Sequence, residues 1–255
     1  MVREFDTFRE YFRDFTDHFM LIGGTACELN LTDFGGFRST KDIDILILLE
    51  RMNSSFANAF HNFLLAGKYK CYVSKDEKRH FYRFLDPDDK NFPQQIELLS
   101  RSLIPNHKDL KYTPLSTDQY IRSMSAIILS EDYYNFGISH RTVKQEIPCL
   151  DSEALIVFKT AAYLNLRQQK SLDASSVRSD DILKHRNDVF RLLGTLVIES
   201  PVSVPDSIRS NLKKFIEFFP ETNPEWRSII QSIGAVADTP EHYIESFMKF
   251  AGLSR

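Results

Sequence analysis

Hydrophobic and polar residues alternate with helical spacing at the start of the chain. Acidic residues and arginines separate a series of phenylalanines, namely Phe5, Phe8, Phe12 and Phe15. Side chains three or four residues apart lie on the same face of an α-helix. The pattern therefore predicts an amphipathic helix over residues 4–17.

The next hydrophobic runs are shorter and predict strands that are separated by glycines. The segment "FMLI" at 19–22 has the length of a short buried strand, and it stops at the glycine pair 23–24. Residues 25–31, "TACELNL", predict a short helix, and residues 32–40, "TDFGGFRST", predict a glycine-containing loop. Residues 42–50, "DIDILILLE", begin with alternation and continue as an apolar run, which is typical of a central strand covered on both faces.

The following residues predict a second helix and further strands. The helix spans residues 54–67, with Gly67 as the left-handed residue at its C-terminal end. A turn-rich segment, "DPDDKNFP", separates the last two of three predicted strands, which lie at 69–74, 80–86 and 94–100. These elements predict an α+β domain over residues 1–112, in which helices flank a mixed sheet.

Beyond residue 112 the pattern predicts a mostly helical domain, residues 113–255. Ser116 and Gln119 have capping-box spacing ahead of "YIRSMSAIIL", residues 120–129. A polar linker, "SLDASSVRSD", separates the first two of four further predicted helices, and "GISHRTVKQEIPCL" predicts irregular structure or a short strand. The four helices are predicted at 152–169, 181–197, 206–219 and 225–237.

Composition fits a globular protein with a substantial core. Of 255 residues, 42% are hydrophobic and 26% are charged, and the 21 phenylalanines are expected to fill much of the core. The formal net charge of −3 argues against a protein that coats nucleic acid by bulk electrostatics. It remains compatible with a local basic groove.

The cysteines and the apolar runs bear on the compartment. Cys27, Cys71 and Cys149 are far apart and form no C-x-x-C spacing, which favours buried thiols in a reducing compartment over disulfides or a zinc site. The N-terminal "MVREFDTFREYFRDF" lacks the continuous apolar segment of a signal peptide, and the runs "ILILL" and "ALIVF" are too short to span a bilayer. We therefore expect a cytoplasmic protein without a membrane partner.

Two aspartates at the start of the predicted central strand are the first candidate for chemistry. Side chains alternate along a strand, so Asp42 and Asp44 are expected on one face, with Ile43 directed into the core. Two neighbouring carboxylates repel each other unless a cation lies between them, and Mg²⁺ is bound through one or two carboxylates together with substrate phosphates. An exposed strand edge with the same residues is the alternative.

The glycine pair before these aspartates suggests a phosphate site. Gly23, Gly24 and Thr25 lie between the predicted strand and helix, where glycine permits close approach of a ligand to the backbone. The free N–H groups and the positive end of the helix dipole favour phosphate. An ordinary strand-to-helix turn is the alternative for the glycines alone. A phosphate site followed by a carboxylate pair is what a magnesium-bound nucleoside triphosphate requires.

These motifs, "GGT" and "RSTKDIDI", resemble the signature of the DNA-polymerase-β-like nucleotidyltransferase superfamily. Members carry a glycine pair, then D-x-D, then a third carboxylate on a later strand, and Glu97 in "QQIELLS" matches the third. The R-x-T-x-D-I-D form, residues 38–44, most resembles the AbiEii-type toxin nucleotidyltransferases of toxin–antitoxin systems. The resemblance implies a catalytic domain at 1–112 in which Asp42, Asp44 and Glu97 hold two Mg²⁺ ions with the bound triphosphate.

The resemblance extends in weaker form to the helical domain. The family uses a lysine on a helix there, and Lys159 in "ALIVFKTAAYLNL" matches it; a lysine extending from the edge of a core helix is the alternative. Family members then resemble R-x-K-D-x-x-D. Here Asp188 is kept, Asn187 replaces the lysine and Arg191 replaces the second acid, while Lys184 lies one turn before Asp188. This departure puts the role of the 184–191 helix, and activity itself, in question.

Other charged residues flank the predicted site. Arg38 and Lys41 are candidates for phosphate contacts, with simple surface solvation as the equal alternative. The basic stretch "SHRTVK", residues 139–144, is a weaker candidate for contact with nucleic acid than for an exposed loop. No G-x-S-x-G or G-x-x-x-x-G-K-[ST] motif is present.

The resulting hypothesis is magnesium-dependent transfer of a nucleoside monophosphate from a nucleoside triphosphate to an acceptor hydroxyl. The resemblance favours tRNA, another RNA or a protein as acceptor in an AbiEii-like toxin setting, with an antitoxin protein as possible partner. A small-molecule acceptor, as in aminoglycoside nucleotidyltransferases, is the first alternative. A catalytically degenerate nucleotide-binding or interaction protein is the second, and the identity of the nucleotide stays open.

Overall fold

The computed structural model describes residues 3–34, 40–73, 79–102, 112–114, 125–175, 177–234 and 239–254. Contacts within the chain divide it into two units, Met1–Asp151 and Ser152–Arg255. The sequence predicted a boundary between residues 112 and 113 instead. The difference arises because the strands at 141–150 are part of the N-terminal sheet, through pairing between Leu21 and Cys149.

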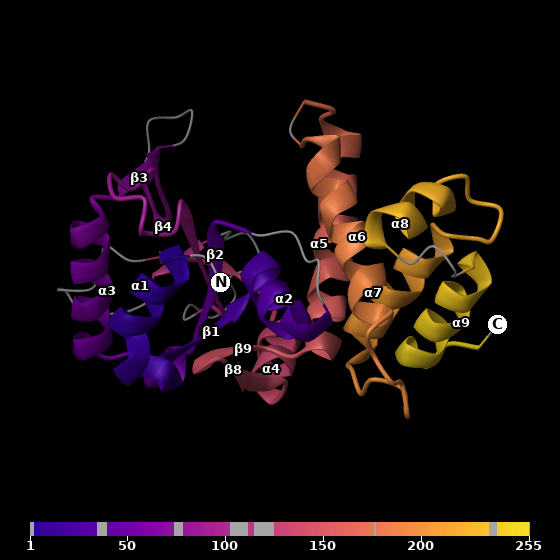
Figure 1. Cartoon of the computed structure of the whole chain (residues 1–255), viewed down its shortest axis with the longest axis horizontal. Coiled ribbons are helices and arrows are strands. Elements are labelled where there is room, and N and C mark those ends of the chain that lie inside the picture. Colours follow the sequence, from indigo (N-terminus) through magenta and orange to yellow (C-terminus); the bar gives the residue numbers. More distant parts are fainter. Residues whose placement is uncertain are drawn as a thin grey trace. The chain divides into compact units, whose positions relative to one another are not determined.

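The described strands form one mixed, nine-stranded sheet in the N-terminal unit (Figure 1). They are β1 Phe19–Ile22, β2 Asp42–Ile47, β3 Lys70–Val73, β4 Arg79–Leu85, β5 Gln95–Ser100, β6 Tyr112–Pro114, β7 Ser125–Ile128, β8 Arg141–Lys144 and β9 Ile147–Leu150. Their order is β3-β4-β5-β2-β1-β9-β8, and β7 pairs with β5 and with β6. β2 is parallel to β5 and antiparallel to β1. The predicted central position of this strand is therefore confirmed.

Four helices belong to the same unit, and α1 and α3 form an aromatic cluster. They are α1 Arg3–Phe12, α2 Gly23–Leu31, α3 Ser54–Gly67 and α4 Glu131–Ser139. Phe8 and Phe12 are buried as the helical spacing predicted, and the ring of Phe8 lies 5.7 Å from that of Phe63 on α3. α1 ends at Phe12, and a kinked 3-10 helix continues to His18. The observed α-helix is therefore shorter than the helix predicted over residues 4–17.

Gly67 does not take the conformation that the sequence predicted. It remains helical, and Lys68 is the left-handed residue at the end of α3, with φ 51°. The reason for glycine here is packing, because a Cβ on Gly67 would lie 2.6 Å from the ring of Tyr69 and 2.8 Å from that of Phe92. The backbone turns one residue later, where the Lys68 N–H donates to carbonyls of α3.

The segment after residue 112 also differs from the prediction. Residues 125–128 form strand β7, whereas the sequence predicted a helix over 120–129. β7 is part of the sheet because it pairs with both β5 and β6. The spacing of hydrophobic residues within one segment carries no information about such pairing partners. The capping-box pair Ser116 and Gln119 lies outside the described residues, and helix α4 was not predicted.

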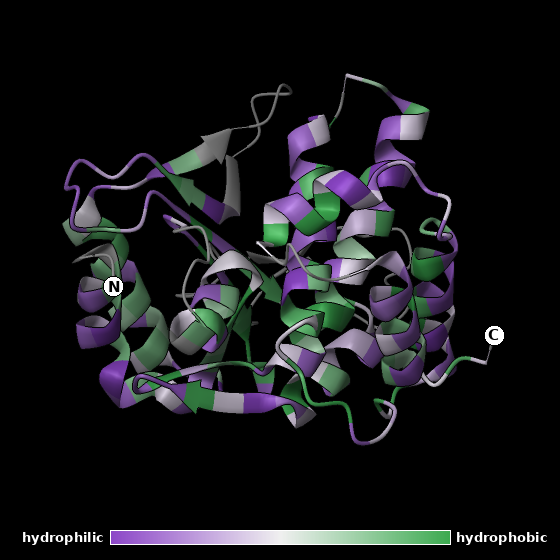
Figure 2. Ribbon diagram, turned by 45° about the vertical axis from the view of Figure 1, so that its right-hand side comes forward, coloured by the Kyte–Doolittle hydropathy of each residue, from purple (hydrophilic) through white to green (hydrophobic). Residues whose placement is uncertain are grey.

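The C-terminal unit is helical, as predicted. Its helices are α5 Ser152–Leu172, α6 Ser179–Leu193, α7 Asp206–Glu217, α8 Trp226–Ile233 and α9 Pro240–Ala251. Phe190 lies at the centre of an aromatic core, with its ring 5.7 Å from Phe215 and 5.0 Å from Trp226. The helices carry both hydrophilic and hydrophobic residues around their circumference (Figure 2). The sequence missed α9, where the Thr239 hydroxyl caps the helix by accepting from the His242 N–H at 3.3 Å.

The fold therefore matches the predicted class, α+β with a mixed sheet flanked by helices and a mostly helical C-terminal part. In the parts of the chain that the structure describes, no helix combines the length and hydropathy needed to cross a membrane.

Candidate functional site

The two aspartates of β2 lie on the same face of the sheet, beside a charged residue of each of the next two strands. Ile43 between them is only 2% exposed, Asp44 is half-buried and Asp42 is exposed. In the register of the sheet, Asp44 is paired with Glu97 on β5, and Glu97 with Arg83 on β4. Directly paired residues point to the same face. The sheet thus brings Asp42, Asp44 and Glu97 together on one surface.

Gly23 brings the turn after β1 against the carboxylate of Asp44. Its φ is +68°, a left-handed value that glycine adopts without strain. A Cβ at this position would lie 1.9 Å from Asp44 Oδ2. Both the backbone conformation and the space thus require glycine. At Gly24 a Cβ would meet Thr40 at 3.3 Å, which is a milder restriction.

Thr25 stabilises the start of β2 through its side chain. The hydroxyl is buried and donates to the carbonyl oxygen of Asp42 at 2.6 Å. The Thr40 N–H donates to Glu28 on α2 at 3.3 Å, and the Asp42 N–H donates to the Thr40 hydroxyl at 3.3 Å. These bonds link the first turns of α2 to the residues just before the aspartates. The Thr25 side chain therefore positions the Asp42 backbone, and the predicted contact of Thr25 with phosphate stays a prediction.

Glu97, the third carboxylate, is held by two neighbouring side chains. Its Oε1 lies 2.6 Å from Arg83 Nε and accepts from Gln95 Nε2 at 2.9 Å. Burial raises the pKa of the Glu97 carboxyl; the positive charge and hydrogen bond of Arg83 oppose this effect, and the charge of Asp42 adds to it. The ion pair with Arg83 thus partly offsets the cost of burying the ionised form of Glu97.

The donor set fits magnesium through the aspartate pair. Asp42 and Asp44 are two carboxylates on one face beside a helix N-terminus, and Mg²⁺ is bound in proteins through one or two carboxylates plus phosphates and waters. Within the described residues no three His, Cys, Asp or Glu side chains are arranged to hold a metal ion.

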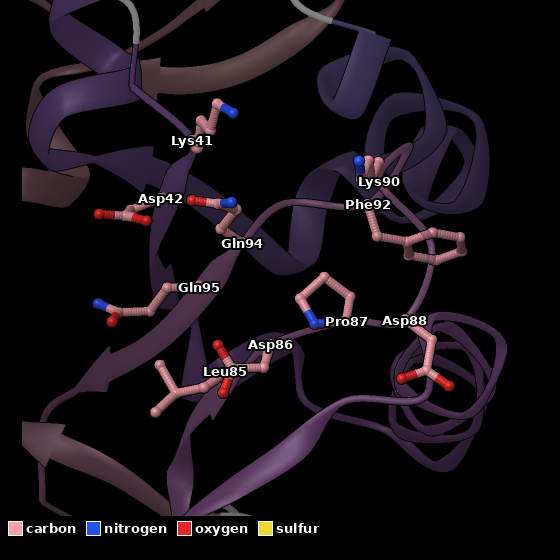
Figure 3. Close-up of a pocket in the computed structure, with 10 residues that line it drawn as sticks. All are labelled: Lys41, Asp42, Leu85, Asp86, Pro87, Asp88, Lys90, Phe92, Gln94 and Gln95. Atoms are coloured by element: carbon pink, nitrogen blue, oxygen red, sulfur yellow. The ribbon is translucent and has the colours of Figure 1, made fainter.

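A pocket of about 650 Å³ lies beside Asp42 (Figure 3). It is formed where β2 and β5 begin and β4 ends, together with the turn between β4 and β5. In the close-up, Lys41 and Lys90 stand on either side of it, and the side chains of Asp42 and Gln95 point the same way. The full lining is Lys41, Asp42, Leu85, Asp86, Pro87, Asp88, Lys90, Phe92, Gln94 and Gln95. The polar lining and the volume suit a small polar ligand or the end of a larger one.

Two of the predicted residues in the C-terminal unit contact each other. Lys159 on α5 donates to Asp188 Oδ2 on α6 at 2.8 Å, and both side chains are almost fully buried. Arg191, which replaces an acid of the family motif, lies 3.8 Å from Asp188 Oδ1. The third predicted residue, Lys184, is exposed and pairs with Asp181 at 3.0 Å. The structure thus groups Lys159 with Asp188 and leaves Lys184 on the surface.

The remaining candidates fall into three groups. Arg38 lies outside the described residues, as does the glycine pair 35–36. Lys41 is exposed and lines the pocket. In the basic stretch at 139–144, Arg141 donates to the Thr16 carbonyl at 2.7 Å, which gives it a structural role.

Two residues at the site were not found from the sequence, namely Arg83 and Gln95. Gln95 lies two residues before Glu97, so strand alternation places it on the same face and provided a usable signal. Arg83 had no such signal, because its position opposite Glu97 depends on the register between β4 and β5.

Comparison with known proteins gives limited similarity. No protein-family profile and no curated protein matches the chain. Among solved structures, the chain is similar to an antigenic nucleotidyltransferase-like protein from Paracoccidioides brasiliensis, with a TM-score of 0.46 and 12% sequence identity. The similarity covers 90% of this chain and 93% of that protein.

Proposed function

We propose that this protein is a magnesium-dependent nucleotidyltransferase that transfers a nucleoside monophosphate from a nucleoside triphosphate to an acceptor hydroxyl. One observation carries the proposal. Asp42 and Asp44 lie on one face at the start of β2, and the glycine turn that begins α2 is packed against the Asp44 carboxylate. Carboxylates and a helix N-terminus, placed side by side, match the two ends of a metal-bound triphosphate.

Each part of the site has a defined task in this proposal. The first N–H groups of α2, from Gly23 onward, bind the outer phosphates. Lys41 adds positive charge next to Asp42, and the same task is proposed for Arg38. Asp42 and Asp44 hold Mg²⁺, which when bound neutralises charge on the phosphates and activates the acceptor hydroxyl.

The other predicted residues complete the proposal. Glu97 serves as the third carboxylate, next to Asp44 in the register of the sheet. In the C-terminal unit we propose Lys159 as the lysine that the family resemblance implies, with Asp188 as its partner at 2.8 Å. We assign Lys184 no more than a supporting role on the surface, given its pair with Asp181.

For the acceptor we propose RNA, including tRNA, or a protein, in an AbiEii-like toxin setting with an antitoxin partner in the cytoplasm. The support is the resemblance of the 38–44 motif to that family. A small-molecule acceptor is the second candidate, and a specific observation favours it. The 650 Å³ pocket that Asp42 borders lies within the size range of small-molecule sites, about 300–1,000 Å³.

A degenerate protein that binds nucleotide without transferring it is the third candidate, supported by the altered 184–191 motif. Calorimetry with each nucleoside triphosphate and Mg²⁺ separates this candidate from the enzyme. Tight binding without turnover on any acceptor pool favours the degenerate protein.

The test of the function is transfer of label from α-³²P nucleoside triphosphates to components of a total cell lysate. Separation of RNA, protein and small molecules then shows which class is labelled. Asp42→Asn and Asp44→Asn remove one negative charge each with little change of shape, so we expect a loss of transfer of at least 100-fold, in line with the size of metal-dependent charge stabilisation. Undiminished transfer by both folded variants would refute the proposal.

A further inference from the structure

A groove of about 330 Å³ lies between α5 and α7, wholly within the C-terminal unit. Its volume is at the lower end of the range for small-molecule sites, about 300–1,000 Å³. The lining residues are Leu164, Asn165 and Gln168 from α5, and Asn211, Lys214, Glu217 and Phe218 from α7 and its C-terminal cap. The groove therefore combines three carboxamides, one charge of each sign and an aromatic ring.

The ring of Phe218 is held in place while part of it stays exposed. The Arg167 guanidinium lies over this ring, 4.1 Å from its centroid, and donates to the Tyr163 hydroxyl at 3.0 Å. A guanidinium over an aromatic ring is stabilised by a cation–π interaction. Phe218 nevertheless remains 40% exposed and lines the groove. The groove thus offers an aromatic surface that is already positioned, which lowers the entropic cost of binding a ligand against it.

The polar side chains of the groove supply both hydrogen-bond donors and acceptors. Asn165, Gln168, Lys214 and Glu217 are all exposed, so a ligand can replace water at each of them. A carboxamide donates and accepts, whereas a lysine ammonium only donates and a carboxylate only accepts. The two charges cancel, so the groove does not select an ion. This lining favours a neutral, planar ligand with donors and acceptors along its edge.

We propose that the groove between α5 and α7 binds an unstacked purine base, carried by a free nucleoside or nucleotide or by single-stranded RNA. Unpaired bases stack on aromatic side chains or arginine guanidinium planes and form hydrogen bonds through their edges. Carboxamides match N6 and N7 of adenine, and lysine matches O6 and N7 of guanine. Pyrimidines lack N7 and present a smaller surface for stacking. The inference goes beyond the proposed transfer reaction, because it concerns the C-terminal unit and does not involve the aspartates of β2.

The test is a titration with uncharged nucleosides, followed by NMR through the side-chain NH₂ signals of Asn165 and Gln168. Nucleosides are the right probe because they lack phosphate, whose charge otherwise contributes sequence-independent binding. Guanosine and adenosine should shift both signals. Their affinities should exceed those of cytidine and uridine by about fivefold or more, since stacking and edge contacts both favour purines. These signals report locally, so they separate binding in the groove from binding of a nucleotide in the N-terminal unit.

A second titration distinguishes the two sources of the base. It compares unstructured oligoadenylate with adenosine, and uses oligouridylate as the pyrimidine counterpart. Tighter binding of oligoadenylate than of adenosine assigns the groove to single-stranded RNA, because neighbouring nucleotides then add contacts. Equal or weaker binding of oligoadenylate assigns the groove to a free nucleoside or nucleotide.

Substitutions in the groove test the stacking surface and the base edge separately. Phe218→Ala should weaken purine binding by about tenfold, in line with the loss of one base–aromatic contact. Tyr11→Ala is its matched control, because Tyr11 is 38% exposed and lies outside the groove, and purine affinity should not change. Lys214→Gln should weaken guanosine binding more than adenosine binding, since lysine matches O6 and N7 of guanine.

Gln168→Ala provides a test that does not disturb the aromatic core. Gln168 is exposed, so its substitution should leave the unfolding midpoint unchanged and weaken binding of both purines. Gln231→Ala, which changes an exposed glutamine of α8, is the control and should bind purines like the wild type. Thermal unfolding of each variant shows whether it is folded during the titration, and the two glutamine variants decide the matter if Phe218→Ala does not fold.

Three outcomes would overturn the inference. The first is that no nucleoside or oligonucleotide shifts the NH₂ signals of Asn165 and Gln168. The second is equal affinity for purines and pyrimidines. The third is purine binding by Gln168→Ala and folded Phe218→Ala that equals binding by their controls. Failure of the proposed transfer reaction would look different, because the purine titration would follow the expected pattern while no labelled nucleotide was transferred.

Discussion

Substitution of Gly23 by alanine tests whether the turn after β1 and the Asp44 carboxylate form one structural unit. The added Cβ would lie 1.9 Å from Asp44 Oδ2, whereas ordinary contacts are 3.4–4 Å. The residue would also be held at φ +68°, which costs an L-residue about 1–2 kcal/mol. Because Asp44 is half-buried and must move, we expect a total loss of about 2–3 kcal/mol in the free energy of unfolding.

Gly234→Ala supplies the matched control. Gly234 has φ +77°, close to that of Gly23, but a Cβ there would meet no atom of the described residues within 4 Å. It therefore measures the backbone strain alone, about 1–2 kcal/mol. The difference between the two variants isolates the displacement of Asp44.

The assays are thermal unfolding and binding of Mn²⁺, a spectroscopic substitute for Mg²⁺. For a domain of this size, about 2–4 °C of unfolding midpoint corresponds to 1 kcal/mol, so Gly23→Ala should lower the midpoint by about 4–12 °C. Trp226, the one tryptophan of the chain, reports by fluorescence on the C-terminal unit, and circular dichroism reports on the whole chain. Gly23→Ala should also weaken Mn²⁺ binding at least tenfold, unlike Gly234→Ala. Equal unfolding midpoints and unchanged Mn²⁺ affinity in both variants would refute the reasoning.

Two further predictions concern charged groups outside this turn. Lys159→Met should lower the free energy of unfolding, measured by urea titration, by about 3 kcal/mol or more, because it leaves the buried Asp188 without its 2.8 Å partner. Lys184→Ala breaks an exposed pair with Asp181 and should change the free energy of unfolding by less than about 1 kcal/mol. Equal losses would contradict the buried character of the first pair. Partial burial raises the pKa of the Glu50 carboxyl. The hydrogen bonds that Glu50 accepts, led by the one from Tyr134, lower this pKa by a larger amount, so it lies below its ordinary value of 4.5. The stabilisation from Glu50 is therefore present above its unfolded pKa and is lost as the pH falls through its folded pKa. Glu50→Gln should make the unfolding midpoint decline less steeply in acid. An acid profile identical to that of the wild type would contradict this role of Glu50.

Local patterns were sufficient for the elements that carry the aspartates. The run "FMLI" and the alternation at the start of "DIDILI" predicted β1 and β2, because strand periodicity and burial are properties of a few consecutive residues. The same alternation placed Asp42 and Asp44 on one face. Helices α5 to α8 were predictable for the corresponding reason, since each has a long apolar face of its own.

Local patterns failed where pairing partners are distant in the chain. Residues 125–128 lie in a segment, 120–129, whose sequence pattern predicted a helix. They form strand β7 because they pair with β5 and β6. The boundary between the units moved to Asp151 because β9 pairs in parallel with β1, far away in the sequence. Gly67 is required by the packing of Tyr69 and Phe92 around it, and the left-handed residue is Lys68.

The sequence by itself determined that two aspartates share a face beside a glycine turn, because both features arise within a short stretch of chain. Only the tertiary structure decided what surrounds the third carboxylate. The register between β4 and β5 places Arg83 opposite Glu97, and the packing of α5 on α6 places Lys159 against Asp188. Strand register and helix packing are set by contacts between distant residues, and the free energy of these contacts is not contained in any local pattern.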